Sequence, residues 1–304
     1  MLQQPAGHSV PTLPRNVREH YPWQGKQLSL EDGVKLHYLD EGSGEPLLML
    51  HGNPTWSFYY RNLVRAFSGM YRCIVPDHVG CGLSDKPLDW PYRLENHARS
   101  IEQLIERLDL RDITLVVHDW GGAIGFAAAL KHRARIKRLI LCNTSVFQGS
   151  VPLSIRVCRW PLSALPVRGL NAFLESLLLL FVPRNARDGI RAGYRAPYRT
   201  WDDRVAIHRF VQDIPIEVDH PTRGLIDELD RATLEFRHLP TLIVWGARDF
   251  VFTDEFLQGW RTRLPQAEVH RLTRAGHLVV EDAPDEVIGL MRDFLRRNPL
   301  PASA

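Results

Sequence analysis

The sequence predicts an α/β fold in which helices cover both faces of a mostly parallel, doubly wound sheet. Short apolar or β-branched runs recur along the chain and alternate with stretches whose apolar residues have helical spacing. At residues 113–130, a β-branched run passes directly into a run of small apolar residues, as a strand does when the next helix packs closely on its sheet. Strands that alternate with helices in this way are typical of parallel sheets.

The strands and helices are expected in the following order. Residues 26–32 and 34–40 alternate between polar and apolar types around Asp32-Gly33, which predicts a β-hairpin. Further apolar runs predict strands at 47–50, 73–75, 113–117, 136–142, 242–245 and 268–272. Apolar residues at helical spacing predict helices at 94–108, 121–130 and 287–294.

Residues 146–219 interrupt this alternation. The segment is rich in proline, arginine and aromatic residues, has helical stretches and no evident strand, and lies between two predicted strands of the sheet. We therefore expect a helical cap at 146–219, inserted into a core formed by residues 24–145 and 220–304, with residues 1–23 as a loose N-terminal arm. A cap suits chemistry from which water must be excluded.

Composition and charge narrow the class of protein. The 304 residues carry a formal net charge of only +3 and the arginines are scattered, which argues against a nucleic-acid partner. Cys73, Cys81, Cys142 and Cys158 have no C-x-x-C or zinc-type spacing, so we expect free thiols in a reducing compartment, without a metal or a cofactor. Because no apolar run is long enough for a signal peptide or a bilayer span, we expect a cytoplasmic protein without an integral membrane segment.

The segment Val117-His118-Asp119-Trp120-Gly121-Gly122 carries the candidate nucleophile. It lies at a predicted strand-to-helix corner, the place where proteins of the α/β-hydrolase fold hold a serine nucleophile, and the central residue here is Asp119. A carboxylate can displace a leaving group from carbon and become an ester. The alternative is that Asp119 only caps the following helix.

Asp249 and His277 are the candidate partners of Asp119. Each follows a predicted strand, so all three are expected at one edge of the sheet, in the chain order that the α/β-hydrolase fold uses. His277 would activate water against the ester, and Asp249 would orient the imidazole. Taken singly, Asp249 could be a turn residue paired with Arg248, and His277 an ordinary loop histidine. Their common position and order favour the catalytic interpretation.

Asn53 and Trp120 form a second candidate group. In this fold the residue after His-Gly and the residue after the nucleophile supply backbone N–H groups to an oxyanion hole. Their side chains, an amide and an indole, are also donors and could hold an anion that departs from carbon. The alternatives are that Asn53 only tolerates a tight turn and that Trp120 fills the seam between cap and core.

These motifs resemble the haloalkane dehalogenase family from about residue 24 onward. The resemblance rests on His51-Gly52-Asn53-Pro54-Thr55-Trp56, residues 77–87, His118-Asp119-Trp120-Gly121-Gly122 and Gly276-His277. With Asn53 and Trp120 as halide donors, Asp249 as the acid and a neutral Asn143, the chain is similar to the third subfamily. Residues 209–215 and 248–252 are also similar to a close branch, the β-lactone decarboxylases of long-chain olefin biosynthesis.

The resemblance implies a small hydrophobic substrate, a haloalkane or a β-lactone, and two reactions that share a first step. As a dehalogenase, which is our main expectation, Asp119 displaces halide and His277 then drives hydrolysis of the alkyl ester. As a β-lactone decarboxylase, Asp119 opens the lactone, and carbon dioxide and a cis-alkene leave without water. A third alternative, an epoxide hydrolase, would use Tyr194 and Tyr198 of the cap as acids, but Asn53 argues against it. A non-enzymatic binding role would leave the triad idle, and residues 177–182 could be a cap helix or a contact in a homo-oligomer.

Overall fold

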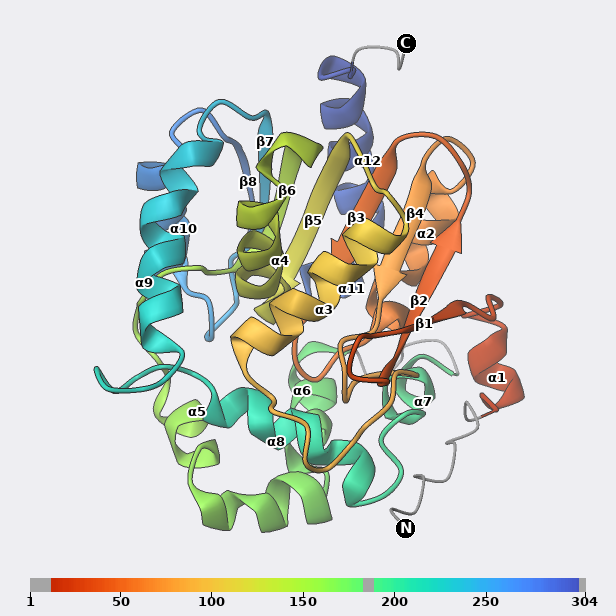
Figure 1. The fold of residues 1–304 in the computed structure, drawn as a ribbon, viewed down its shortest axis with the longest axis vertical. Coiled ribbons are helices and arrows are strands. Elements are labelled where there is room, and N and C mark those ends of the chain that lie inside the picture. The colour runs from red at the N-terminus through yellow and green to blue at the C-terminus, as the bar shows by residue number, and fades with distance from the viewer. Residues whose placement is uncertain (1–11, 183–188, 301–304) are drawn as a thin grey trace.

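The fold is built on a single sheet, shown in a computed structural model that describes residues 12–182 and 189–300 (Figure 1). Its strands are β1 Lys26–Ser29, β2 Lys35–Glu41, β3 Pro46–Leu50, β4 Arg72–Pro76, β5 Ile113–Asp119, β6 Ile136–Thr144, β7 Thr241–Gly246 and β8 Glu268–Leu272. Their spatial order is β1-β2-β4-β3-β5-β6-β7-β8. β1 and β2 form the predicted antiparallel hairpin, β2 pairs antiparallel with β4, and the remaining neighbours are parallel.

Helices cover both faces of the sheet, which confirms the predicted fold class (Figure 1). One face carries α3 Leu94–Arg107, α4 Trp120–Lys131, α9 Arg223–Ala232 and α10 Asp254–Arg263, and the other carries α2 Arg61–Phe67, α11 Val279–Asp282 and α12 Pro284–Arg297. In β3, Leu48 and Leu50 join the first hydrophobic cluster, whereas Leu47 and Met49 join the second. A strand buried on both faces is a continuous apolar run, which is why β3 and β5 could be recognised in the sequence.

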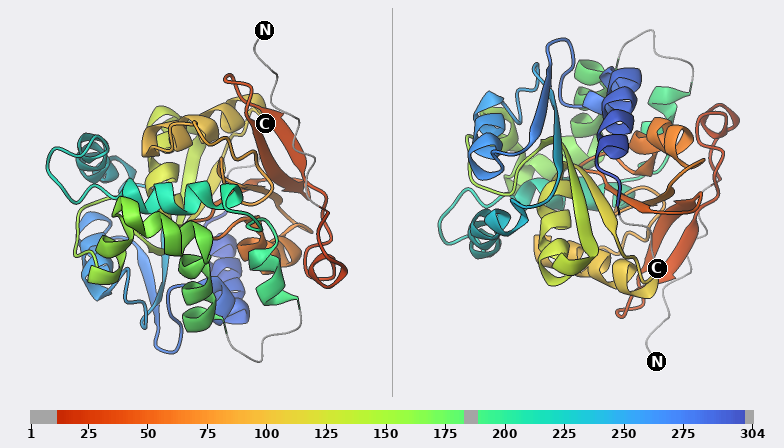
Figure 2. Two further views of the ribbon diagram at one scale, coloured as in Figure 1. Left: turned by 90° about the horizontal axis from the view of Figure 1, so that it is seen from below. Right: turned by 90° about the horizontal axis from the view of Figure 1, so that it is seen from above.

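The chain leaves the sheet after β6 and forms a layer of helices over the carboxyl ends of the parallel strands (Figures 1 and 2). This layer holds α5 Leu153–Cys158, η3 Pro161–Ser163, the π-helix η4 Leu165–Gly169, α6 Ala172–Phe181, α7 Ile190–Arg195, η5 Asp202–Arg204 and α8 Val205–Gln212. No strand occurs in residues 146–182 and 189–219, in line with the helical cap that we predict. The remaining short elements are α1 Arg15–Arg18, η1 Ser57–Tyr60, η2 Arg133–Arg135 and η6 Thr233–Phe236.

The prediction of a loose N-terminal arm is wrong for residues 12–23. Val17 and Tyr21 are buried, and α1 packs against α7 of the cap. Tyr21 also shares a buried hydrogen bond with Ser57, with 2.6 Å between the two hydroxyl oxygens. The apolar residues that anchor this segment have partners distant in sequence, so local composition did not reveal them. The rest of the predicted arm, residues 1–11, lies outside the described residues.

Candidate active site

Asp119 lies at the sharp corner where β5 ends and α4 begins. Its backbone has φ of 51°, in the left-handed region that non-glycine residues rarely occupy. Two glycines make room for this corner. A Cβ atom on Gly121 would lie 2.0 Å from the carbonyl oxygen of Leu50, and one on Gly52 would lie 2.0 Å from Asp119 Oδ1. The strained corner holds the carboxylate at the edge of the sheet, as a nucleophile elbow does.

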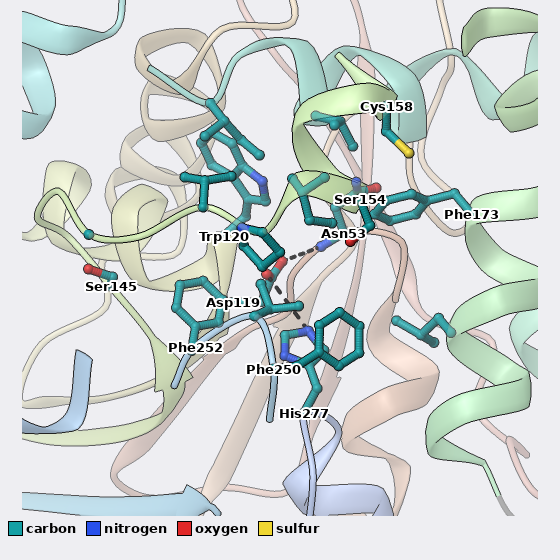
Figure 3. Close-up of a pocket in the computed structure, with 18 of the residues that line it drawn as sticks. Asn53, Asp119, Trp120, Ser145, Ser154, Cys158, Phe173, Phe250, Phe252 and His277 are labelled. Carbon is teal, nitrogen blue, oxygen red and sulfur yellow. Dashed lines mark hydrogen bonds and ion pairs between the residues drawn. The ribbon is translucent and has the colours of Figure 1, made fainter. Parts of the chain in front are cut away.

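Asp119, Asp249 and His277 lie together at this edge: Asp119 ends β5, and Asp249 and His277 lie in the loops after β7 and β8. Figure 3 shows Asp119 and His277 facing each other. His277 Nδ1 donates a hydrogen bond to Asp249 Oδ2 at 2.8 Å, since a carboxylate oxygen can only accept. The other ring nitrogen, Nε2, lies 3.8 Å from Asp119 Oδ2. All three side chains are buried. The structure therefore brings together the nucleophile, histidine and acid that we predict.

Asn143 and His118 hold the two partners of the nucleophile in place. Asn143 lies in β6, next to β7, and its Nδ2 donates to Asp249 Oδ2 at 3.0 Å and to the carbonyl oxygen of Gly246 at 3.1 Å. The Asn143 side-chain oxygen accepts the N–H of Gly246 at 2.7 Å. His118 points away from the nucleophile, and its Nε2 donates to the carbonyl oxygen of His277 at 2.8 Å. The role of Asn143 could not be found from sequence spacing, because it depends on the pairing of β6 with β7.

Asn53 and Trp120 both line the cavity above Asp119. The backbone N–H of Asn53 donates to Asp119 Oδ1 at 2.7 Å, and its side-chain Nδ2 donates to the carbonyl oxygen of Ile207 in α8 at 3.1 Å. The Trp120 indole packs on Phe210, with 5.4 Å between ring centroids, and its N–H meets no acceptor within the described part of the chain. Trp120 thus offers a free donor beside the cavity, whereas one of the two Asn53 amide hydrogens is already used.

The cavity has a volume of about 470 Å³ and its walls are mostly apolar. Asp119, Asn53, Trp120 and His277 supply the polar groups near its centre. In the close-up, Ser145 and Phe252 lie on one side of Asp119, and Cys158 and Phe173 lie on the other (Figure 3). The nucleophile therefore stands between two apolar regions of one cavity, so a substrate with two apolar arms could place its reactive carbon at Asp119.

Comparisons with known proteins find relatives of one fold. An alpha/beta hydrolase fold family model matches residues 45–178. The chain is 45% identical to the cis-3-alkyl-4-alkyloxetan-2-one decarboxylase of Shewanella oneidensis, over 87% of this chain and 86% of that protein. It is 32% identical to haloalkane dehalogenase 2 of Mycobacterium bovis, over 88% of this chain and 93% of that protein. The solved haloalkane dehalogenase DatA from Agrobacterium tumefaciens superimposes with a TM-score of 0.81 at 27% identity, covering 91% and 97% of the two chains.

The chain belongs to the α/β-hydrolase family that includes these decarboxylases and dehalogenases. The resemblance inferred from the motifs is thereby confirmed, together with the placing of the chain near the decarboxylase branch. Among the relatives compared here, identity is higher to the decarboxylase than to the dehalogenase.

Burial is the largest influence on the pKa values of Asp119 and His277. It raises the pKa of Asp119 above its usual value, while His277 and the backbone N–H groups of Trp120 and Asn53 limit the rise. For His277, burial by itself would lower the pKa, but Asp249 and, less strongly, Asp119 raise it above its usual value. The carboxylates therefore favour a proton on the imidazole, and a step that needs neutral His277 is favoured as the pH rises.

The two tyrosines that an epoxide hydrolase would use as acids, Tyr194 and Tyr198, lie away from the cavity. Tyr194 and Tyr198 are buried but are not among the residues that line the cavity. The Tyr194 hydroxyl donates to Glu281 at 2.7 Å, and the Tyr198 hydroxyl lies 3.4 Å from the carbonyl oxygen of Thr55. Both hydroxyls serve the contact between cap and core, so neither is placed to protonate an epoxide held over Asp119.

Among residues 12–182 and 189–300, no group of three or more His, Cys, Asp or Glu side chains is arranged to hold a metal ion.

Proposed function

We propose that this protein is a β-lactone decarboxylase that converts a cis-3-alkyl-4-alkyloxetan-2-one into a cis-alkene and carbon dioxide. The observation that carries the proposal is the 45% identity to a decarboxylase of that name over most of both chains, against 32% to a dehalogenase. The motifs alone led us to expect a dehalogenase first. The comparisons favour the alternative instead.

The cavity suits such a substrate. A cis-3,4-dialkyl β-lactone has two apolar chains on adjacent ring carbons, and the cavity has apolar regions on both sides of Asp119. One chain would occupy the region beside Phe252, and the other the region beside Phe173 (Figure 3). The four-membered ring would then lie over Asp119, with its oxygens near the donors of Trp120 and Asn53.

In the first step, Asp119 Oδ2 attacks ring carbon C4, and the bond between C4 and the ring oxygen breaks. The configuration at C4 is inverted, the substrate becomes an ester of Asp119, and the ring carbonyl carbon becomes a free carboxylate on C3. We assign stabilisation of this new negative charge to the Trp120 indole N–H and the remaining Asn53 amide hydrogen. The backbone N–H of Asn53, 2.7 Å from Oδ1, holds the attacking carboxylate in position.

In the second step, the electrons of the bond between C3 and the carboxylate carbon form the C3=C4 double bond. Carbon dioxide leaves, the C4–O bond of the ester breaks, and Asp119 is restored as a carboxylate. Inversion in the first step places the carboxylate and the ester oxygen anti to each other. Inversion followed by anti elimination amounts to a syn process, so a cis lactone gives a cis alkene. No water is consumed.

Dehalogenation is the second candidate, and the placement of His277 favours it. Its Nε2 lies 3.8 Å from Asp119 Oδ2, close enough to direct a water at an ester carbonyl, and decarboxylation has no need of that water. The free Trp120 indole N–H could equally hold a departing halide. The site can therefore support both reactions after the same first displacement.

The test is to incubate the purified protein in ¹⁸O-labelled water with a cis-3,4-dialkyl oxetan-2-one and, separately, with 1-bromobutane. We expect cis-alkene and carbon dioxide in equal amounts from the lactone, with no ¹⁸O in the organic product, and slower release of bromide. Asp119→Ala should abolish both activities. Formation of labelled β-hydroxy acid in place of alkene, or bromide release without any lactone turnover, would reject the decarboxylase proposal.

A further inference from the structure

The cap turns large apolar side chains towards solvent. Six of them, each between 60% and 85% exposed, define what we call the cap patch: Leu153, Trp160, Leu162, Leu165, Leu170 and Leu180. They come from α5, η3, η4 and α6 and the loops between these elements, and η4 packs against both η3 and α6. In the view from below, these helices face the viewer (Figure 2). An exposed apolar surface of this kind on a globular protein marks an interaction site.

The inward side of the same elements packs against the hydrophobic core of the protein itself. In α6, Leu174, Leu177 and Leu178 are buried in the second hydrophobic cluster, and Val167 of η4 is buried with them. A helix that packs on its own core usually presents polar residues on its outer side. The outer side of α6 instead presents Leu179 and Leu180. The cap patch is therefore available to a partner without any part of the fold coming apart.

The cap patch is continuous with the mouth of the active-site cavity. Leu180 belongs to the patch and also lines the cavity. Ser154 of α5 and Pro166 of η4 likewise line the cavity and are exposed. The cavity therefore reaches the surface between α5, η4 and α6, where the surrounding surface is apolar.

One unpaired positive charge, Arg156, borders the patch. Residues 151–181 contain three arginines, Arg156, Arg159 and Arg168, and a single acidic residue, Glu175. Glu175 is paired with Arg195, Arg159 with Glu217 and Arg168 with Asp202. Arg156 is exposed and has no ion-pair partner among the described residues. Leucine and tryptophan on one surface, bordered by arginine, are the composition of segments that lie in the interface of an anionic membrane.

We propose that the cap patch docks on the surface of an anionic lipid bilayer, with its leucines at the level of the lipid headgroups and the cavity mouth facing the lipid. An apolar substrate could then enter, and an apolar product leave, without crossing water. This exchange rests on the proposed function, whereas docking does not. A second copy of the chain is disfavoured as the occupant, because a symmetric contact would bury the unpaired Arg156 of both copies, and the patch holds no acidic residue to pair with it. A protein partner is disfavoured because leucine is under-represented among the residues that dominate such interfaces.

The helices of the cap fit a position on a membrane. Within residues 12–182 and 189–300, no single helix is long and apolar enough to cross a bilayer. The pair Pro161–Gly169 and Ala172–Phe181 would meet that test together but is bent by 62° at the break.

Flotation with vesicles tests the proposal directly. We expect the intact protein to float with phosphatidylcholine vesicles that contain phosphatidylglycerol, more weakly with pure phosphatidylcholine, and less in high salt. The double variant Leu162→Glu/Leu165→Glu should lower the partition coefficient by at least about tenfold, and Arg156→Gln by about fivefold. Met70→Glu and Leu234→Glu alter leucine-sized exposed residues outside the patch and serve as matched controls that should float normally.

Tryptophan fluorescence reports contact with lipid at one residue. Trp160 is 66% exposed, so its emission should shift to the blue and be quenched by brominated lipid when vesicles are added. The Trp160→Phe variant should lose most of that change. Absence of flotation with either vesicle, or flotation unaffected by Leu162→Glu/Leu165→Glu, would overturn the proposal.

Two further measurements separate the alternatives. If the protein is dimeric without lipid, and the double variant is monomeric while neither binds vesicles, a second copy occupies the patch and the proposal is wrong. The Asp119→Ala variant should dock like the unaltered protein. Docking without lactone turnover would therefore reject only the proposed function, and lactone turnover without docking would reject only this inference.

Discussion

Two opposing influences act on the pKa of the Asp119 carboxyl group. Burial disfavours its charged form, whereas His277 and two backbone N–H groups favour it. Oδ2 faces His277, and Oδ1 accepts a hydrogen bond from the backbone N–H of Asn53. In the proposed reaction Oδ2 would therefore attack the substrate, and Oδ1 would become the carbonyl oxygen of the ester.

The residues of the triad could be predicted because each follows an apolar strand in a recognisable motif. Asn143 could not be given a role at that stage, since its contact with Asp249 depends on two neighbouring strands. The use of one Asn53 amide hydrogen by Ile207 also escaped prediction, because Ile207 lies in the cap, far along the chain.

The His277→Ala variant should separate the two chemistries. Hydrolysis needs His277 to activate water, so bromide turnover should fall by at least about 100-fold. Asp119 should still be alkylated, and intact-protein mass spectrometry should show the butyl adduct accumulate. Decarboxylation needs no water, so lactone turnover should fall by less than about tenfold. If the variant gave no adduct while the unaltered protein released bromide, Asp119 would not be the nucleophile.

Replacement of Asn143 should show how Asp249 controls the histidine. In Asn143→Asp, a second carboxylate would stand beside Asp249, so the pKa of His277 should rise and the pH profile of bromide release should move to higher pH. In Asn143→Ala, no charge is added, so the profile should move little. That variant should instead lose about 1–3 kcal/mol of unfolding free energy, because Gly246 loses both side-chain partners. Equal pH profiles for both variants would show that Asn143 acts only through packing.

At the scale of elements, the strands were easier to predict than the helices: all eight strands were expected, including β1 and β8, which are only partly buried. β3 is apolar throughout, and β5 is mainly apolar as far as Val117; both were placed to within a few residues. Outside the cap, five α-helices of the described residues were not predicted: α1, α2, α9, α10 and α11. Among them, α9 carries Ile226, Leu229 and Ala232 at helical spacing. The signal there was weak because, apart from Gly224 and Leu225, the rest of α9 is charged.

Because α4 approaches the sheet closely at Gly121, we expect the added methyl group of a Gly121→Ala variant to reduce both stability and activity strongly. In Gly121→Ala, the added Cβ would meet the Leu50 carbonyl oxygen at 2.0 Å, and neither backbone can move without moving the nucleophile. We expect a loss of about 3 kcal/mol or more in unfolding free energy, measured in urea, and loss of activity. Gly224→Ala is the control: it lies in α9 with nothing within 4 Å of the new Cβ, and should stabilise by about 0.5–1 kcal/mol. Unchanged stability of Gly121→Ala would mean that the corner is more adaptable than the structure indicates.

At the scale of the whole molecule, the sheet positions the candidate catalytic residues, and the cap forms much of the cavity through which a substrate would reach them. The catalytic candidates come from loops at the carboxyl ends of three strands, whereas much of the cavity wall comes from α5, η4 and α6. The motifs could therefore identify the family, but not the shape of the cavity or the exposed patch. Both depend on how the helices of the cap pack, which residue order alone does not determine.

The pH dependence of stability offers a test at this scale, through Asp282. Burial raises the pKa of this carboxyl from 3.8 to about 6, although it accepts the N–H of Gly276 at 2.7 Å. Between these two pH values the folded protein binds a proton that the unfolded chain has released, so the unfolding free energy falls as the pH rises through that window. Asp282→Asn keeps an acceptor for Gly276 but has no charge to bury. We expect urea unfolding to show the variant about 2 kcal/mol more stable than the unaltered protein at pH 8, a value reduced for the partial exposure of Asp282. The difference should shrink towards zero near pH 4, and a difference that stays constant across this range would show that the raised pKa of Asp282 does not contribute.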